Sequence, residues 1–205
     1  MARVLTLDAA LAVCSAGLVE GGCVLDARSV RDDLAALPAL VESLFAAHGR
    51  ALHAVVVTVG PGSFTGLRAA ISLAHGIGIA AGVPVIGVSV GAALAAGAPP
   101  GRPVWAAIDS KRGRVFLERD GALDSVALDR LPRPDGPIAV VGDAAVAVVA
   151  RLAAAGVDVQ LLRSRAPDPG GIARAASAGQ NRPAQPLYVD PPDARPGPPG
   201  RPAPA

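Results

Sequence analysis

The chain begins with short apolar segments separated by small and polar residues. Residues 4–7, 11–19 and 23–27 have the apolar and β-branched content of strands, and Gly21-Gly22 supplies the positive φ angles that a tight hairpin needs. Because strands joined by tight turns run antiparallel, these segments predict an antiparallel meander at the start of the fold.

A long amphipathic stretch follows. Residues 29–48 carry apolar side chains every three or four positions, with acidic and polar residues between them. The spacing predicts a helix of about five turns that ends at Gly49. Pro38 falls in the middle of this helix, where it removes a backbone donor and clashes with the preceding turn, so we expect a kink there.

The next segments alternate between strand and helix patterns. Residues 54–59 are continuously apolar and mostly β-branched, as in a strand that is covered on both faces. A helix over 64–81, a strand over 83–88 and a short helix over 89–96 complete the run. Residues 1–103 are therefore predicted to form one lobe, of the α/β class with a mixed sheet.

The second half again contains strand and helix patterns, and it predicts a smaller lobe over residues 104–190. Its predicted elements are strands at 104–108 and 114–119 around a turn at 110–113, a strand at 138–141, a helix at 144–155, a strand at 157–162 and a helix at 169–178.

The C-terminal end is rich in proline. Nine of the 23 residues from 183 to 205 are proline, so this segment cannot hold a regular helix or sheet. Residues 191–205 are predicted to be a disordered tail. The hydrophobic residues at 186–189 are expected to be pinned to the body of the protein.

Composition narrows the classes of function. The chain is 51% hydrophobic and 18% charged, which excludes global disorder, and its 19 basic against 17 acidic residues exclude a free-standing nucleic-acid platform. Residues 1–8 lack the apolar region of a signal peptide, so we expect a cytoplasmic protein. Glycines and a proline interrupt the uncharged stretch at 69–98, so we expect no membrane span.

A glycine-rich block lies between the predicted strand at 54–59 and the helix at 64–81. It reads Gly60-Pro61-Gly62-Ser63-Phe64-Thr65-Gly66-Leu67-Arg68.

A strand, a glycine turn and a helix together form the geometry that binds phosphate on free amides. The glycine spacing departs from the dinucleotide fingerprint, no Gly-Lys pair follows as a P-loop requires, and the residues around Ser63 exclude a nucleophile elbow. Two hypotheses remain for the block. It either binds an anion, or it starts a helix with Ser63 as the N-cap and Gly66 allowing close packing.

Arg68 is the only formally charged residue between positions 51 and 101. It lies in the first turn of its predicted helix, where the helix dipole disfavours a cation. We therefore expect an acidic or carbonyl-rich partner, either within this chain or on another subunit.

Other candidate chemistry is sparse. Asp8, at the end of the first strand, could hold a hydrated magnesium ion as in sugar-kinase and heat-shock-type ATPases, but Ala9 and Ala10 replace the glycine and hydroxyl residues that bind phosphate there. Nucleotide hydrolysis is therefore not expected. The three histidines show no metal-ligand spacing.

Five segments together resemble the TsaB (YeaZ) family, over about residues 3–190. They are residues 5–8 with Cys14-Ser15, the block Gly60 to Arg68, residues 84–89, residues 107–116 and residues 186–189. The resemblance implies a two-lobed α/β fold like that of actin, Hsp70 and sugar kinases. It also implies a bacterial role in making the threonylcarbamoyl group on adenosine 37 of tRNAs that read codons starting with A.

The resemblance also implies partners. In that family the protein is a non-catalytic partner of the homologous subunit TsaD, which carries the metal, the nucleotide and the transfer chemistry, and the ATPase TsaE joins the pair. For this chain it implies no catalytic residue, cofactor or metal, a heterodimer with TsaD, a homodimer when isolated, and contact with tRNA only through the complex. An independent ATP-dependent phosphotransferase and a metallopeptidase-like protein are the alternatives.

Two helices are candidates for the partner interface. The outward part of the first helix's apolar stripe, including Leu37 and Leu44, is expected to meet the same helix pair of TsaD. The candidate residues are Leu34, Leu37, Pro38, Val41, Leu44, Phe64, Leu67 and Arg68.

Overall fold

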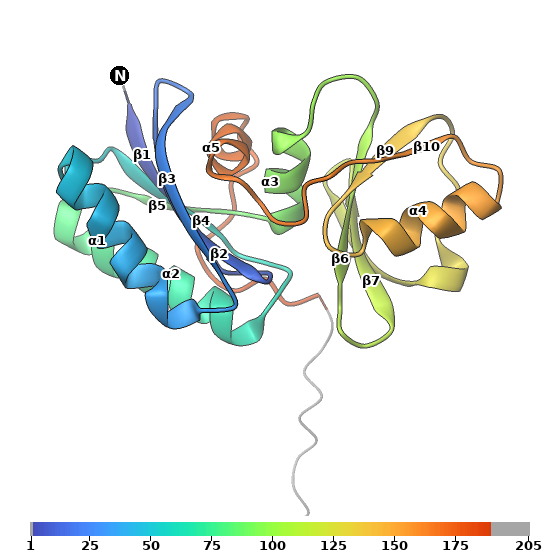
Figure 1. Cartoon of the computed structure of the whole chain (residues 1–205), viewed down its shortest axis with the longest axis horizontal. Coiled ribbons are helices and arrows are strands. Elements are labelled where there is room, and N and C mark those ends of the chain that lie inside the picture. The colour runs from blue at the N-terminus through green and yellow to red at the C-terminus, as the bar shows by residue number, and fades with distance from the viewer. Residues whose placement is uncertain (1, 190–205) are drawn as a thin grey trace, which may run out of the picture.

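Two five-stranded mixed sheets, each in its own lobe, organise the computed structural model, which describes residues 2–189 (Figure 1). The first sheet has the spatial order β3 (Cys23–Arg31), β2 (Val13–Glu20), β1 (Arg3–Asp8), β4 (Ala54–Thr58) and β5 (Val85–Val88). The second has the order β10 (Val159–Leu161), β9 (Ile138–Val141), β6 (Val104–Asp109), β7 (Arg114–Arg119) and β8 (Ala122–Ala127).

Helices cover both faces of the first sheet. The helices α1 (Leu37–His48) and α2 (Phe64–Ala81) pack on one face, and α3 (Val90–Gly97) and α5 (Pro169–Ser177) lie on the other, between the two sheets (Figure 1). This arrangement explains why β4 is buried along its whole length.

The first helix starts later than its apolar spacing predicts. β3 continues to Arg31, a 3₁₀ turn η1 (Leu34–Ala36) follows, and α1 begins only at Leu37. Pro38 therefore lies in the first turn of α1, where the missing N–H has no intrahelical partner to lose. The predicted kink is wrong, whereas the predicted end at Gly49 is confirmed.

The second helix has the predicted bounds. Ser63 caps α2 by accepting a hydrogen bond from the Gly66 N–H at 3.2 Å, and Gly82 ends it in the left-handed conformation. Within residues 2–189, α2 is the one helix that is long and apolar enough to cross a membrane. A core helix of a globular protein can have the same length and composition, and a third of α2 is buried inside this protein.

The second lobe contains a strand that the hydrophobic pattern did not predict. β8 pairs antiparallel with β7 across a turn in which Asp120 and Gly121 have φ of 50° and 78°. An Asp-Gly pair between apolar residues is a hairpin signal, so the sequence did carry the information. The helix α4 (Ala145–Ala154) packs on the outer face of this sheet (Figure 1).

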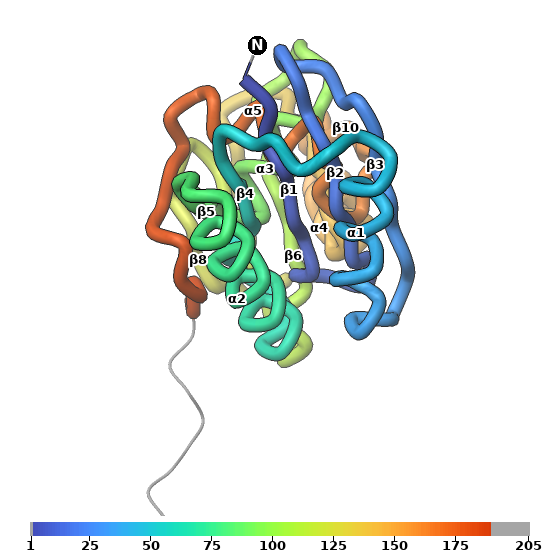
Figure 2. The backbone as a smooth tube through the Cα atoms, turned by 90° about the vertical axis from the view of Figure 1, so that its left-hand side faces the viewer, coloured from blue at the N-terminus to red at the C-terminus, as the bar shows by residue number. Residues whose placement is uncertain are grey.

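The chain returns to the first lobe before it ends. α5 packs against α3 and the first sheet, and residues 179–189 then run along the β5 side of that lobe (Figure 2). Leu187 donates its N–H to the Val59 carbonyl at 2.7 Å, which confirms that residues 186–189 are pinned. The predicted second lobe, 104–190, is thus corrected, because residues 169–189 belong with the first sheet. The predicted tail, 191–205, lies outside the described residues.

Candidate functional site

Asp8 lies fully buried at the end of β1. Its Oδ1 accepts hydrogen bonds from Thr58 Oγ1 at 2.5 Å and from the Ala10 N–H at 3.2 Å, while its Oδ2 has no partner among the described residues. Burial raises the pKa of this carboxyl to about 6, although both hydrogen bonds act in the opposite direction.

The glycine block covers the segment that follows Asp8. Ser63 donates its N–H to the Ala10 carbonyl at 2.7 Å. A Cβ at Gly62 would lie 2.3 Å from the Ala10 oxygen, and a Cβ at Gly66 would lie 1.9 Å from the Ala9 oxygen. Only glycine allows this approach, and the contacts support the hypothesis of a helix start built for close packing.

The covered segment does not fit a phosphate or a hydrated metal ion. Ala9 and Ala10 are both buried, and their carbonyls face the backbone of the glycine block. A bound phosphate needs free N–H groups and room for its oxygen atoms beside them. Within this fold, that room is taken by the start of α2.

Arg68 packs into a small exposed cluster with two aromatic residues at the start of α2. Its guanidinium lies 3.9 Å from the centroid of the Phe64 ring, and its Nε donates to the Tyr188 hydroxyl at 3.1 Å. The two rings stack with centroids 5.7 Å apart. No carboxylate in residues 2–189 forms an ion pair with Arg68, so the aromatic cluster replaces the partner that we expected within this chain.

The structure divides the predicted interface residues into two groups. Leu37, Val41, Leu44 and Leu67 are buried in the core of the first lobe, so the expectation that Leu37 and Leu44 face outward is wrong. Their stripe packs on the sheet. The other four residues of the predicted interface are at least partly exposed: Leu34, Pro38, Phe64 and Arg68. Their role at an interface stays a prediction.

An apolar groove of about 420 Å³ runs between α1 and α2. Of the residues that line the groove, the sequence analysis proposed Pro38 and Val41 but none on α2. The signal for the α2 side was a second apolar stripe, spaced by four and three residues, at Leu73, Ile77 and Ala80. The groove is lined by Pro38, Val41, Glu42, Phe45, Arg50, Ala51, Leu52, Leu73, Ile77, Ala80 and Ala81. Ile79, also on α2, is 83% exposed but is not among the residues that line the groove.

The second lobe has its own carboxylate at the matching position. Asp109 ends β6, and its Oδ1 accepts the Lys111 N–H at 2.8 Å while Lys111 Nζ lies 3.0 Å from its Oδ2. The Lys111 hydrogen bonds hold the pKa of Asp109 below its usual range. Asp143 accepts the Asp109 N–H at 2.8 Å, and burial raises the pKa of Asp143.

A buried polar contact joins the two lobes and was not predicted. Ser89, the N-cap of α3, donates to Glu118 Oε1 on β7 at 2.5 Å, and burial raises the pKa of Glu118. The Glu118 side chain lies so close to Gly91 that a Cβ there would meet Oε2 at 2.3 Å. Segment 114–119 also contains Arg114 and Arg119, so the charge of Glu118 was not a distinctive signal in the sequence.

Metal-ligating side chains do not converge in the described part of the chain. In residues 2–189, no group of three or more His, Cys, Asp or Glu residues could hold a metal ion.

Comparisons with known proteins find similarity to TsaD and to TsaB (YeaZ). The model for the family TsaD, tRNA N6-adenosine threonylcarbamoyltransferase, matches residues 24–155. The tRNA threonylcarbamoyladenosine biosynthesis protein TsaB of Escherichia coli is 34% identical over 122 residues, which are 56% of this chain and 53% of that protein. In this alignment the chain spans about half the length of that relative.

Two further relatives extend the similarity over nearly the whole chain. The uncharacterized protein Rv3421c of Mycobacterium tuberculosis is 32% identical over 212 residues, which are 96% of this chain and 95% of that protein. The structure of YeaZ from Pseudomonas aeruginosa is 25% identical, covers 92% of this chain and 100% of that chain, and superposes with a TM-score of 0.78. The predicted two-lobed α/β fold like that of sugar kinases is confirmed.

Proposed function

This chain belongs to the TsaB (YeaZ) family, and we propose that it is the non-catalytic partner of TsaD in the transfer of a threonylcarbamoyl group to adenosine 37 of tRNAs that read codons starting with A. Family membership supports a part for this chain in the formation of tRNA threonylcarbamoyladenosine. In the proposed complex TsaD supplies the metal, the nucleotide and the chemistry, TsaE joins the pair, and tRNA meets this chain through the complex, in the cytoplasm.

The observation that supports this assignment is the packing of the glycine block over Ala9 and Ala10, which follow Asp8. A catalytic lobe of this fold needs an open backbone turn beside a charged carboxylate. Here the turn lies under Gly62 and Gly66, and burial disfavours the charge of Asp8. We therefore assign no step of the transfer to this chain.

We propose that the groove between α1 and α2 receives the equivalent helices of TsaD. The TsaD family model matches residues 24–155, a range that includes both helices, so TsaD carries a homologous pair. Homologous chains that use the same helices can pack around a pseudo-twofold axis. The apolar groove, together with the exposed Ile79 elsewhere on α2, provides apolar surface that such a bundle would bury.

The variant Ile79→Asp tests this interface. Because Ile79 is exposed, the fold should tolerate the charge. A charge buried where the bundle covers α2 should weaken TsaD binding by about 2 kcal/mol or more, roughly 30-fold, and lower the yield of threonylcarbamoyladenosine in a reconstituted reaction. Binding can be measured by calorimetry or by pull-down.

A matched control is Val146→Asp on α4. Val146 is also an exposed apolar helix residue, at 53% exposure, but it lies in the second lobe. It should leave TsaD binding and yield unchanged. Equal effects of the two substitutions, or full TsaD binding by the Ile79→Asp variant, would argue against the groove as the docking site.

A further inference from the structure

A cavity of about 470 Å³ lies between the two lobes, next to α3 and therefore on the face of the first sheet opposite α1 and α2 (Figure 1). The first lobe contributes α3 and the segment that follows α5, and the second lobe contributes the start of β6 and the end of β7. Pockets that bind small molecules have volumes in this range. The residues of its lining that matter below are Ser89, Ala92, Ala95, Val104, Glu118 and Arg182.

Glu118 brings a buried carboxylate to this cavity that is only partly satisfied. The residue is 7% exposed, and its Oε1 accepts a hydrogen bond from Ser89 Oγ at 2.5 Å. Its Oε2 has no hydrogen-bond partner among the described residues. Because a buried carboxylate oxygen without a donor is costly, this wall of the cavity lacks a donor group that a ligand can supply.

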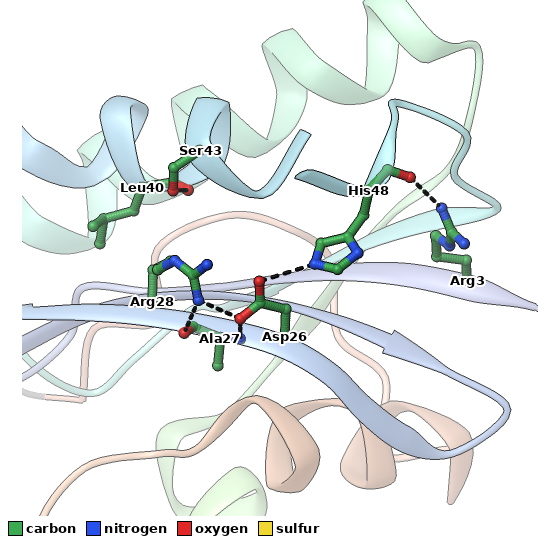
Figure 3. Close-up of polar contacts among 7 residues, drawn as sticks. All are labelled: Arg3, Asp26, Ala27, Arg28, Leu40, Ser43 and His48. Carbon is green, nitrogen blue, oxygen red and sulfur yellow. Dashed lines mark hydrogen bonds and ion pairs between the residues drawn. The ribbon is translucent and has the colours of Figure 1, made fainter. Parts of the chain in front are cut away.

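Asp26, on β3, shows how a carboxylate is satisfied when it serves the fold alone. Its Oδ1 accepts the Ala27 N–H at 2.8 Å, and its Oδ2 lies 2.9 Å from His48 Nε2 (Figure 3). Both oxygens of Asp26 are therefore occupied by groups of this chain. Glu118 differs, because one of its oxygens stays unpaired although the residue is the more deeply buried of the two.

Arg182 provides the opposite charge beside the same cavity. Its backbone exchanges hydrogen bonds of 3.0 and 2.8 Å with Gly87, which fixes its position next to β5. Burial raises the pKa of Glu118, whereas the Ser89 hydrogen bond and the positive charge of Arg182 lower it, so the guanidinium lies near that carboxylate. Within residues 2–189, Arg182 forms no ion pair with Glu118 or with any other carboxylate. The cavity thus has one anionic and one cationic group that are not paired with each other.

Small apolar side chains form another wall of the cavity. Ala92 and Ala95 lie three residues apart on α3 and so share one face of the helix, and Val104 begins β6. Such a wall suits an aliphatic group of a few carbon atoms.

We propose that this cavity binds a free amino acid with an aliphatic side chain. The ammonium group of the ligand donates to Glu118 Oε2, its carboxylate accepts from the Arg182 guanidinium, and its side chain contacts the apolar wall. A simple anion or a simple cation fits less well, because each leaves one of the two charged groups of the cavity without a partner. The ligand contacts both lobes, so its binding also holds them together.

Binding of L-valine to this chain alone tests the proposal, and the result does not depend on TsaD. Calorimetry or titration followed by NMR should show saturable binding at one site, with a Kd of about 1 mM or lower. Two analogues each lack one charged group: 3-methylbutanoate lacks the amino group of valine, and 2-methylpropylamine lacks its carboxylate. Each should bind at least about tenfold more weakly, because it loses one charge-assisted hydrogen bond.

Two substitutions place the site in this cavity. Arg182→Gln removes the cation, and Ala95→Leu fills the space beside the apolar wall, so each should weaken L-valine binding at least about tenfold. Both residues are partly exposed, so the fold should tolerate the changes, and melting curves monitored by circular dichroism check this. Arg151→Gln is the matched control, because Arg151 is an exposed arginine of α4 outside the cavity, and this variant should bind L-valine like the wild type.

Three results would overturn the proposal. They are no saturable binding of L-valine, equal affinity for L-valine and both analogues, or unchanged affinity in the folded Arg182→Gln and Ala95→Leu variants. Glu118 would then be a buried contact that only joins the two lobes.

Discussion

The two lobes place an aspartate at the same point of their sheets and treat it in opposite ways. In each, a central strand pairs antiparallel with the next strand and parallel with a later one, and it ends in Asp8 or Asp109. Burial raises the pKa of Asp8 to about 6, whereas the Lys111 hydrogen bonds lower that of Asp109. Topology thus fixes where the carboxylate lies, and the residues around the turn set the direction in which its pKa shifts.

The largest effect on stability should come from a side chain that pushes the glycine block away from the segment that follows Asp8. Gly66→Ala places a Cβ against the Ala9 carbonyl, a backbone atom that cannot move aside easily. Overpacking typically destabilises by about 1–3 kcal/mol, and this close contact belongs at the upper end. We expect the melting temperature to fall by on the order of 10 °C.

Gly76→Ala is the matched control for that substitution. Gly76 lies on the same helix but has nothing within 4 Å of an added Cβ, so alanine should leave stability unchanged or raise it by up to about 1 kcal/mol. Similar melting curves for the two variants would show that the glycine block does not press on the Asp8 turn.

Asp8→Asn should change how stability depends on pH. The pKa of folded Asp8, about 6, lies above its ordinary value of 3.8, so the penalty for burying the charge is absent below pH 3.8 and complete above pH 6. Wild-type stability should therefore fall, relative to the Asp8→Asn variant, by about 3 kcal/mol as the pH rises from 4 to 7. Chemical denaturation at several pH values measures this difference, and a constant difference would contradict the burial of a titrating Asp8.

Asp109→Asn should give a smaller effect of opposite sign. Because the pKa of folded Asp109 is lowered, its contribution to stability is present above its ordinary pKa and is lost as the pH falls below that value. The side chain is 42% exposed, so solvent screening should limit the contribution to less than about 1 kcal/mol. In the same denaturation series, the wild type should be more stable than the Asp109→Asn variant at pH 7 and equally stable in acid.

Local signals predicted much of the first lobe. The bounds of α2 follow from Ser63 as N-cap and Gly82 as terminator, and β4 follows from its continuous β-branched run. The predicted kink at Pro38 was wrong because a proline can mark either a kink or the start of a helix. Only the extension of β3 to Arg31 decides between the two. β8 was missed because its apolar residues do not alternate with polar ones, although Asp120-Gly121 marked its turn.

Only part of the candidate site could be predicted from the sequence. Ala9 and Ala10 showed that the phosphate-binding hydroxyls are absent, but the covering of that segment depends on contacts between residues more than 50 positions apart. The contact between Ser89 and Glu118, and the pairing of Arg68 with Tyr188, likewise join segments that no periodicity connects. Such contacts arise from packing of whole elements.

The most direct test of the central claim, that this chain supports TsaD without doing chemistry itself, is the yield of threonylcarbamoyladenosine obtained with the Asp8→Asn variant. The reaction would contain TsaD, TsaE and tRNA, at a temperature well below the melting point of both forms of this chain. We expect the yield to equal that of the wild type, because the covered carboxylate takes no part in the transfer. A large loss of yield, with melting temperature and TsaD binding unchanged, would contradict the account.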